Sequence, residues 1–394
     1  MILLSCQTPN QIDFCMKIIC APDSFKESLT AAEAAHAMAQ GITDVLPAAD
    51  VDRCPIADGG DGTVDALLSA TGGEAHVTRV IGPLGDAVEA QWAMVGSDGG
   101  QPRTAVIEMA TASGMALLEP ARRDPTRTTS FGTGQLIAAA IDQGARRIIL
   151  GIGGSATNDG GCGAAAALGV QFLDARGKTV DQHVTGGMLA TIDRIETSRL
   201  DARIADTRVV VACDVSNPLT GPNGAAHVYG PQKGATPRQV EQLDEALCHL
   251  ADLMRRQCGR DVQTMPGAGA AGGMGGGMVA ILGASLEPGV KLVLEAVGFD
   301  RRVAGCDLCL TGEGRLDGQS VSGKACLGVA QAARRHGVRT IALVGSIGPD
   351  AERTLDAGLA AYHAIGCGLS NEESIRRASQ LLRQTAGRVV RSEV

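Results

Sequence analysis

The 394-residue chain is poor in aromatic residues, with one Trp, two Tyr and five Phe, so Ala, Val, Leu and Ile must build its core. No apolar run reaches the ~18–20 residues of a transmembrane helix, and the start lacks the basic segment of a signal peptide. The net charge is −8 and the basic residues are scattered, which disfavours nucleic-acid binding. The twelve cysteines show no disulfide spacing, as is typical of a reducing compartment. We expect a cytoplasmic protein.

Glycine, by contrast, is abundant (53 residues) and gathers in short loops. A short apolar run, a loop rich in Gly, Asp, Ser and Asn, and a helix-like stretch recur in that order. The pattern occurs in MKIICAPDSFKES, VDRCPIADGGDGT, RRIILGIGGSATNDGG, RVVVACDVSNPLTG, CDLCLTGEGRLDG and RTIALVGSIGPD. Apolar strands that alternate with helices predict an α/β fold with parallel sheet covered on both faces. Ligands of such sheets bind at the carboxyl ends of the strands, so these loops are the expected site.

The segment 77–118 differs, because it is rich in predicted strands and turns. This change suggests a second domain inserted into the first. We expect residues 16–76 and 285–394 to form a discontinuous, Rossmann-like parallel-sheet domain, and residues 77–284 to form an inserted α/β domain. Residues 1–15 are expected to be a disordered tail, and the active site to lie in the interdomain cleft.

Two helices have clear start signals. A capping box at Thr30–Glu33 predicts a helix that stops near Gly41. Thr236 followed by Pro237 predicts a second helix, which should run to about Gln257.

Lysine is scarce, with six residues against 29 arginines, and three of the six lie in glycine-rich loops: Lys26, Lys233 and Lys324. A compact ammonium group suits phosphate oxygens, so these three are candidate phosphate contacts. The alternative is that they are ordinary surface lysines.

Two glycine motifs fail as nucleotide fingerprints. The stretch 318–325 nearly matches G-x-x-x-x-G-K-[ST] but ends in Ala325, so the hydroxyl that would bind Mg²⁺ is absent. A phosphate at that helix start stays plausible. The G-x-G-x-x-G at 267–272 follows a proline-containing segment that makes a poor strand, which disfavours a nicotinamide cofactor.

Acidic residues follow the predicted strands, at Asp23, Asp58, Asp61, Asp214, Glu313 and Asp317. Mg²⁺ binds one or two carboxylates together with phosphate oxygens, so acids beside glycines and lysines suit Mg²⁺-phosphate chemistry. The alternative is ordinary turn chemistry, in which Asp and Gly are common. The loop GIGGSATNDGG should open a helix at Gly160–Gly161 and let an anionic ligand touch main chain, unless its glycines serve only tight packing.

Nine stretches, in order from Met16 to about Gly366, resemble the bacterial glycerate kinases. They are APDSFKESLTA, PIADGGDGTVDAL, IEMATASG, TTSFGTGQLI, ILGIGGSATNDGG, ACDVSNPL, GPQKGA, GAGAAGGMG and TGEGRLDGQSVSGKA. The resemblance implies phosphorylation of D-glycerate by ATP with Mg²⁺, giving 2-phosphoglycerate, with 3-phosphoglycerate as the alternative product. It also implies two α/β domains with the active site between them. The expected partners are D-glycerate and ATP, with a homodimer as one option and with no membrane or nucleic acid.

Phosphoryl transfer depends on positioning and on neutralising charge, and its chemistry divides the loop residues into four groups. The catalytic group is Asp214, which would orient or deprotonate the acceptor hydroxyl, then Asp61 and Lys26. The nucleotide-binding group is Lys324, Lys233, Gly153, Gly154, Ser155 and Gly323. The glycerate-binding group is Ser24, Asp23, Asp58, Thr157, Asn158 and Arg315, with Lys26 and Ser24 at the carboxylate. The Mg²⁺ group is Glu313 and Asp317.

Two other function classes stay open. A nicotinamide-dependent dehydrogenase would bind NADH and would not turn over ATP. A non-catalytic sugar-acid sensor would bind glycerate and release no ADP.

Overall fold

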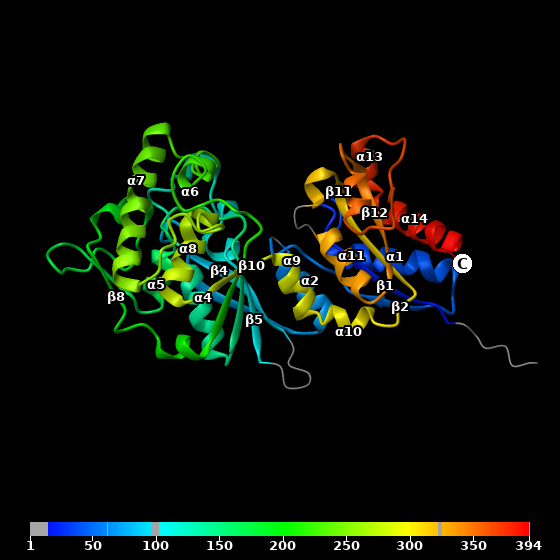
Figure 1. Cartoon of the computed structure of the whole chain (residues 1–394), viewed down its shortest axis with the longest axis horizontal. Helices are drawn as coiled ribbons and strands as arrows, with labels where there is room; N and C mark the ends of the chain where they lie inside the picture. The colour runs from blue at the N-terminus through cyan, green and yellow to red at the C-terminus, as the bar shows by residue number, and fades with distance from the viewer. Residues whose placement is uncertain (1–14, 61, 96–101, 322–324, 394) are drawn as a thin grey trace, which may run out of the picture.

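The computed structural model describes residues 15–60, 62–95, 102–321 and 325–393. Their strands form a five-stranded sheet, a six-stranded sheet and a small antiparallel pair, and the two larger sheets lie in separate lobes (Figure 1). The five-stranded sheet contains β1 (Lys17–Pro22), β2 (Asp50–Arg53), β11 (Leu308–Leu316), β12 (Arg339–Ile347) and β13 (Ala361–Ala364). The six-stranded sheet contains β3 (Glu74–Ile81), β4 (Ala87–Val95), β5 (Thr104–Glu108), β6 (Arg147–Gly151), β9 (Arg208–Ala212) and β10 (Ser285–Glu287). The pair is β7 (Gln171–Leu173) and β8 (Arg194–Glu196).

The five-stranded sheet is entirely parallel, in the order β13-β12-β11-β1-β2. Read from the β2 edge, with the five strands renumbered 1 to 5 along the chain, this is the doubly wound order 2-1-3-4-5. The strand order reverses between β1 and β11, and ligands of such sheets bind outside the strand ends at that point. The predicted α/β class is confirmed, and this sheet has the flavodoxin-like rather than the dinucleotide-binding strand order.

The six-stranded sheet has the order β10-β9-β6-β5-β4-β3. Its strands β5, β6, β9 and β10 are parallel, whereas β3 and β4 pair antiparallel and β4 is antiparallel to β5. These antiparallel strands confirm that the segment predicted to be β-rich differs from its surroundings.

Helices cover both sheets. The α-helices of the described residues are α1 (Ala31–Val45), α2 (Thr63–Thr71), α3 (Ala110–Ser113), α4 (Phe131–Asp142), α5 (Cys162–Ala167), α6 (Ala225–Tyr229), α7 (Pro237–Leu253), α8 (Ala270–Leu282), α9 (Gly289–Ala296), α10 (Phe299–Val303), α11 (Ala325–Arg335), α12 (Arg353–Asp356), α13 (Asn371–Arg376) and α14 (Ala378–Glu393). In the part of the chain that the structure describes, no helix has both the length and the apolar character needed to span a bilayer.

A continuous apolar core joins the two lobes. It combines Ile19 of the five-stranded sheet with Val106 and Val210 of the six-stranded sheet, through Leu67 of α2 and Val293 of α9. Figure 1 shows α2 and α9 between the lobes. The carboxyl ends of the parallel strands are therefore held in a fixed relation by buried side chains.

The chain enters the six-stranded sheet at β3 and leaves it at β10, so the five-stranded sheet is built from both ends of the sequence. The expected boundaries do not coincide with the strands, since β3 begins at Glu74 rather than after residue 76. Residues 285–287 form β10 and pair with β9, although they were expected in the first domain. We propose that the inserted domain runs from residue 74 to residue 287.

The capping box of α1 is confirmed, because Thr30 Oγ1 accepts from Glu33 N and the Glu33 carboxylate accepts from Thr30 N. The predicted stop at Gly41 is wrong, since α1 continues to Val45. A Cβ at Gly41 would overlap the carbonyl oxygen of Arg383 in α14. This glycine is therefore needed for close packing between helices, not for ending one.

The start of α7 is also as predicted. Thr236 Oγ1 accepts from Gln239 N at 3.3 Å, and Gln239 Oε1 accepts from Thr236 N at 2.8 Å. Thr236→Ala should lower the free energy of unfolding by about 1 kcal/mol, the usual contribution of such a cap. Urea denaturation monitored by circular dichroism measures this, and an unchanged midpoint would show that Pro237 alone fixes the helix start.

Candidate active site

Two cavities open at the carboxyl ends of the parallel strands. The first, of about 270 Å³, is lined by residues after β6 and β9 and is called here the β6–β9 cavity. The second, of about 580 Å³, is lined by residues after β1 and at the end of β11 and is called the β1–β11 cavity. Asp58, in the loop after β2, lines both. The loops expected to form the site thus line two cavities that share one residue.

The loop after β6 supplies main chain to the β6–β9 cavity through Gly153, Gly154 and Ser155. A Cβ at Gly151 would lie 2.6 Å from the carbonyl oxygen of Gly59, so this glycine allows the loops after β2 and β6 to approach each other. The helix α5 begins after Gly161, as predicted. Close packing therefore explains Gly151, and contact of the loop's main chain with an anionic ligand stays a prediction.

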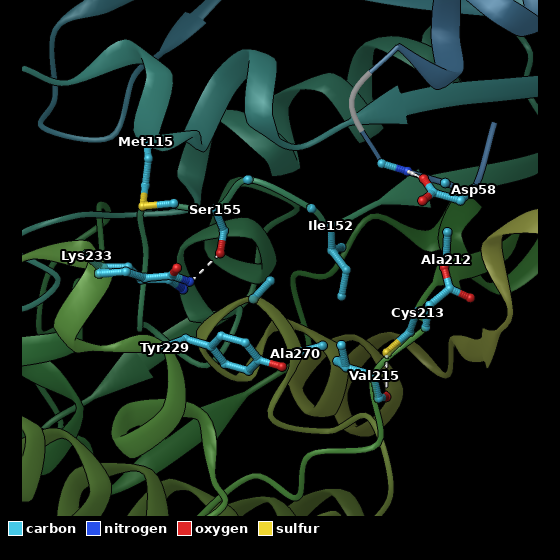
Figure 2. A pocket seen from close by; sticks show the side chains of 17 residues that line it. Asp58, Met115, Ile152, Ser155, Ala212, Cys213, Val215, Tyr229, Lys233 and Ala270 are labelled. Carbon is cyan, nitrogen blue, oxygen red and sulfur yellow. Dashed lines mark hydrogen bonds between the residues drawn. The ribbon is translucent and has the colours of Figure 1, made fainter. Parts of the chain in front are cut away.

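Lys233 lies in the turn before α7, and its side chain is almost completely buried, with 2% of the residue exposed. Its Nζ donates to Ser155 Oγ (2.9 Å) and to Thr157 O (2.7 Å); Figure 2 shows the first of these bonds at one side of the cavity. Burial lowers the pKa of Lys233 to about 7, and the negative charge of Asp159 opposes this shift. An anion that enters the cavity would raise this pKa and favour the charged ammonium form.

Asp159 stabilises this loop through hydrogen bonds, a role that the sequence did not predict. Its carboxylate accepts from the backbone and hydroxyl of Ser130 (both 2.7 Å) and from the backbone N–H groups of Gly161 and Gly163 (3.1 and 3.2 Å). Burial raises the pKa of Asp159, and these hydrogen bonds act in the opposite direction. The acidic residue in GIGGSATNDGG could have indicated this role from sequence, but its partner Ser130 lies 29 positions away.

Thr157 and Asn158, expected to contact glycerate, are fully buried and do not line either cavity. Thr157 Oγ1 and both polar atoms of the Asn158 amide have no hydrogen-bond partner within the described residues. These side chains line neither cavity, so their expected contact with glycerate stays a prediction. Thr157 acts instead through its carbonyl oxygen, which accepts from Lys233.

Asp214 follows β9 and lines the β6–β9 cavity, in the position expected for it. Its Oδ1 accepts from the backbone N–H of Gly289, the first residue of α9, at 3.0 Å. The side chain keeps contact with water, but partial desolvation raises its pKa to about 6. The Gly289 N–H lowers the pKa and the charge of Asp58 raises it. A carboxylate of this pKa is ionised at neutral pH and is more basic than an ordinary Asp.

The β1–β11 cavity is built on the tight loop after β1. Phe25 is buried and exchanges backbone hydrogen bonds with Leu29 (2.8 and 2.9 Å). Glu27 has a φ of 66°, a conformation that is costly outside glycine and is common at functional sites. The loop thereby places Ser24 and Lys26 on the cavity wall.

Four acidic residues line this cavity: Asp23, Glu27, Asp58 and Glu313. Burial raises the pKa of Asp23 to about 7, with further increases from the charges of Asp58 and Glu313 and a decrease from its hydrogen bond with Ser24 N. Such repulsion is relieved by a cation. No cluster of three or more His, Cys, Asp or Glu side chains in the described residues could hold a metal alone, but Mg²⁺ needs only one or two carboxylates beside phosphate oxygens. The donor set therefore fits Mg²⁺ that arrives with a nucleotide.

Of the remaining expected residues, one lines a cavity, one lies outside both cavities, and three are not among the described residues. Arg315 lines the β1–β11 cavity, and its Nε lies 3.2 Å from Asp317 Oδ2. Asp317 does not line either cavity, so its expected role as a metal ligand stays a prediction. Asp61, Gly323 and Lys324 lie outside the described residues.

Comparison with known proteins decides the family. Residues 18–393 match the glycerate kinase family. A glycerate kinase of Halalkalibacterium halodurans is 48% identical, over 94% of this chain and 96% of the relative. The chain belongs to the glycerate kinase family. It is therefore an enzyme of the phosphotransferase class, and the resemblance seen in nine sequence stretches is confirmed.

Other members of the glycerate kinase family support the same conclusion. A protein of Escherichia coli K12 named glycerate 2-kinase is 44% identical, over 96% of each chain. A crystal structure of a Salmonella typhimurium LT2 protein, named as glycerate kinase 2, superposes with a TM-score of 0.86 at 45% identity, and the match covers 96% of this chain and 98% of that one. The two-lobed α/β fold is thus the fold of this family.

Proposed function

We propose that the protein transfers a phosphoryl group from ATP to D-glycerate with Mg²⁺, giving 2-phosphoglycerate and ADP. The observation that carries the proposal is the pairing of Asp214 and Lys233 in one small cavity, next to an acid-rich cavity that shares Asp58. A base and a cation are what a hydroxy acid requires of a phosphoryl-transfer site. The name of the Escherichia coli relative favours the C2 hydroxyl over the C3 hydroxyl.

In this proposal Asp214 accepts the proton of the glycerate hydroxyl as the oxygen forms its bond to the γ-phosphorus. The bond from that phosphorus to the bridging oxygen of ADP breaks, and ADP leaves with the electron pair. Positioning and charge neutralisation account for most of the catalysis of such transfers. Gly153 and Gly154 line the cavity without side chains, so the substrate can approach their main chain closely.

Mg²⁺ would be held by Glu313 and one of Asp23 and Asp58, all of which line the β1–β11 cavity, together with phosphate oxygens. When bound, the ion neutralises negative charge on the phosphate oxygens. The Asp317 carboxylate, expected as a second ligand, faces Arg315 and would hold that guanidinium in place.

The test is an incubation of the purified protein with ATP, MgCl₂ and D-glycerate. ADP should form only when all three are present, and ¹³C and ³¹P NMR should show phosphate on C2 of the product. Phosphate on C3 would establish the alternative product. ADP release that is equal without glycerate would contradict the proposal.

A dehydrogenase has little support. The G-x-G-x-x-G stretch does not follow a strand, and Ala271 and Gly272 adopt left-handed backbone conformations (φ of 53° and 69°) inside α8. A dinucleotide fingerprint instead joins a strand directly to a regular helix. The cytoplasmic location and the homodimer stay predictions.

A further inference from the structure

We propose that the two substrates are divided between the two cavities in a definite way. Glycerate occupies the β6–β9 cavity, with its carboxylate on Lys233 Nζ and Ser155 Oγ, and the nucleotide phosphates occupy the β1–β11 cavity. This inference rests on the proposed function. It reverses the expectation from sequence, in which Lys233 binds the nucleotide and Lys26 the glycerate carboxylate.

The sizes of the cavities separate the two ligands. Pockets for drug-sized molecules have volumes of roughly 300–1,000 Å³, and the β6–β9 cavity, at about 270 Å³, lies below that range. It suits a three-carbon acid and is too small for a purine, a ribose and three phosphates. The β1–β11 cavity, at about 580 Å³, lies within the range.

The Lys233 side chain is positioned to bind an anion in the β6–β9 cavity. In its charged form Lys233 has three N–H donors, and the described residues provide acceptors for two of them, Ser155 Oγ and Thr157 O. The side chain is buried and lines the cavity, so the third donor needs a partner there. A charged group buried without sufficient partners is costly, and a substrate carboxylate removes that cost.

Among the described residues, few other groups near Lys233 could bind the glycerate carboxylate. The Tyr229 hydroxyl already donates to Asn217 Oδ1 at 2.7 Å. Met115, Ile152 and Ala270 make the rest of the wall apolar, and an ion pair in such surroundings is stronger than one in water. Ser155 accepts from Lys233 through Oγ, which leaves its own hydroxyl proton free to donate to a second carboxylate oxygen.

The order of residues along the cavity then orients the substrate. Figure 2 shows Lys233 and Ser155 at one side, and Asp58, Ala212 and Cys213 at the opposite side. Asp214, the proposed base, directly follows Cys213. With its carboxylate on Lys233, glycerate presents its hydroxyls toward Asp214 and Asp58, where the second cavity begins.

The β1–β11 cavity has the features of a nucleotide site. It lies at the point where the strand order of the parallel sheet reverses, between β1 and β11, which is where doubly wound sheets bind their ligands. Lys26 and Arg315 supply cations for phosphates, and Ile365 and Ile375 supply apolar surface. The acids that fit Mg²⁺ line the same cavity.

The test compares Lys233→Met with Lys26→Met, and uses Lys178→Met, an exposed loop lysine, as the matched control. Binding of D-glycerate and of Mg²⁺–ADP is measured separately by isothermal titration calorimetry. Lys233→Met should weaken glycerate binding by about 10–100-fold, the range for a hydrogen bond to a charged group, and leave ADP binding unchanged. Lys26→Met should show the reverse, and Lys178→Met should change neither affinity.

A second measurement separates a charge contact from a structural role. Wild-type protein should bind D-glycerate much more tightly than its neutral amide, D-glyceramide, and Lys233→Met should abolish that preference. Weaker ADP binding with unchanged glycerate binding in Lys233→Met would overturn the inference, as would a retained preference for glycerate. Because binding is measured without turnover, an absence of ADP formation by the wild-type enzyme would contradict the proposed function without deciding the division of the cavities.

Discussion

Asp214→Asn should lower kcat for glycerate phosphorylation by about 10²–10⁴-fold, the usual contribution of a general base. The substitution keeps the size of the side chain and removes the carboxylate that would accept the hydroxyl proton. Steady-state ADP formation with saturating glycerate and Mg²⁺–ATP measures the effect. Binding of Mg²⁺–ADP should change little, because Asp214 lines the smaller cavity and not the β1–β11 cavity.

The contact with Gly289 makes this experiment selective. Asn retains an Oδ1 that can accept from Gly289 N, so Asp214→Asn should unfold at nearly the same urea concentration as the wild type. Asp214→Ala removes the acceptor at the start of α9 and should lose about 1 kcal/mol of stability as well as activity. Asp181→Asn is the matched control, because Asp181 Oδ1 accepts from the backbone N of His183 at 2.8 Å on the surface. A nearly normal kcat in Asp214→Asn would end its assignment as the base.

The pH dependence of kcat/KM in the wild type and in Asp214→Asn tests the same assignment. The pKa of Asp214 is raised to about 6, so the carboxylate form that can accept a proton is lost as the pH falls through 6. Wild-type kcat/KM should therefore decrease about tenfold per pH unit below that value. In Asp214→Asn this acid limb should be absent, whereas a purely structural Asp214 would leave it in place.

The sequence predicted the chemistry of the loops better than their arrangement. Apolar runs followed by glycine, acid and lysine are local patterns, and they correctly indicated strands whose carboxyl ends line two cavities. The contacts that give the residues their roles are not local. Lys233 meets Ser155 across 78 positions, and Asp214 meets Gly289 across 75.

The division into two cavities depends on topology in the same way. Lys26 and Lys233 look equivalent in sequence, because both lie in short glycine- or serine-rich loops. They separate because β1 pairs with β11 while β6 pairs with β9, and no local signal specifies which strands become neighbours. Gly41 failed as a helix stop for a related reason, since its packing partner Arg383 is more than three hundred residues away.

The polar residues of GIGGSATNDGG show the limit of assigning contacts from residue type. Ser155 points to the cavity and accepts from Lys233, whereas Thr157 and Asn158 are buried beneath it. A glycine of α8 lies directly against the main chain of this loop. A Cβ at Gly272 would overlap the carbonyl oxygen of Thr157, so α8 packs directly on the main chain of this loop.

Gly289→Ala should destabilise the protein by about 1–3 kcal/mol, the usual effect of overpacking, and should lower kcat together with stability. A Cβ at Gly289 would overlap the carbonyl oxygen of Asp58 and would lie 2.9 Å from Gly59 Cα. The start of α9 must then move away from the loop after β2. That movement stretches the hydrogen bond from Gly289 N to Asp214 and displaces Asp58, which lines both cavities.

Urea denaturation and steady-state kinetics on Gly289→Ala measure both effects, with Gly153→Ala as the control for stability. A Cβ at Gly153 would have Gly60 Cα, at 3.5 Å, as its nearest neighbour, an ordinary contact, so its unfolding free energy should stay within about 0.5 kcal/mol of the wild type. Wild-type stability and kcat in Gly289→Ala would mean that α9 shifts without disturbing the acids, and that the contact between the lobes does not position the site. We expect kcat to fall even at temperatures where the variant is fully folded, because Gly289 N donates to Asp214 and an added Cβ would overlap the carbonyl oxygen of Asp58.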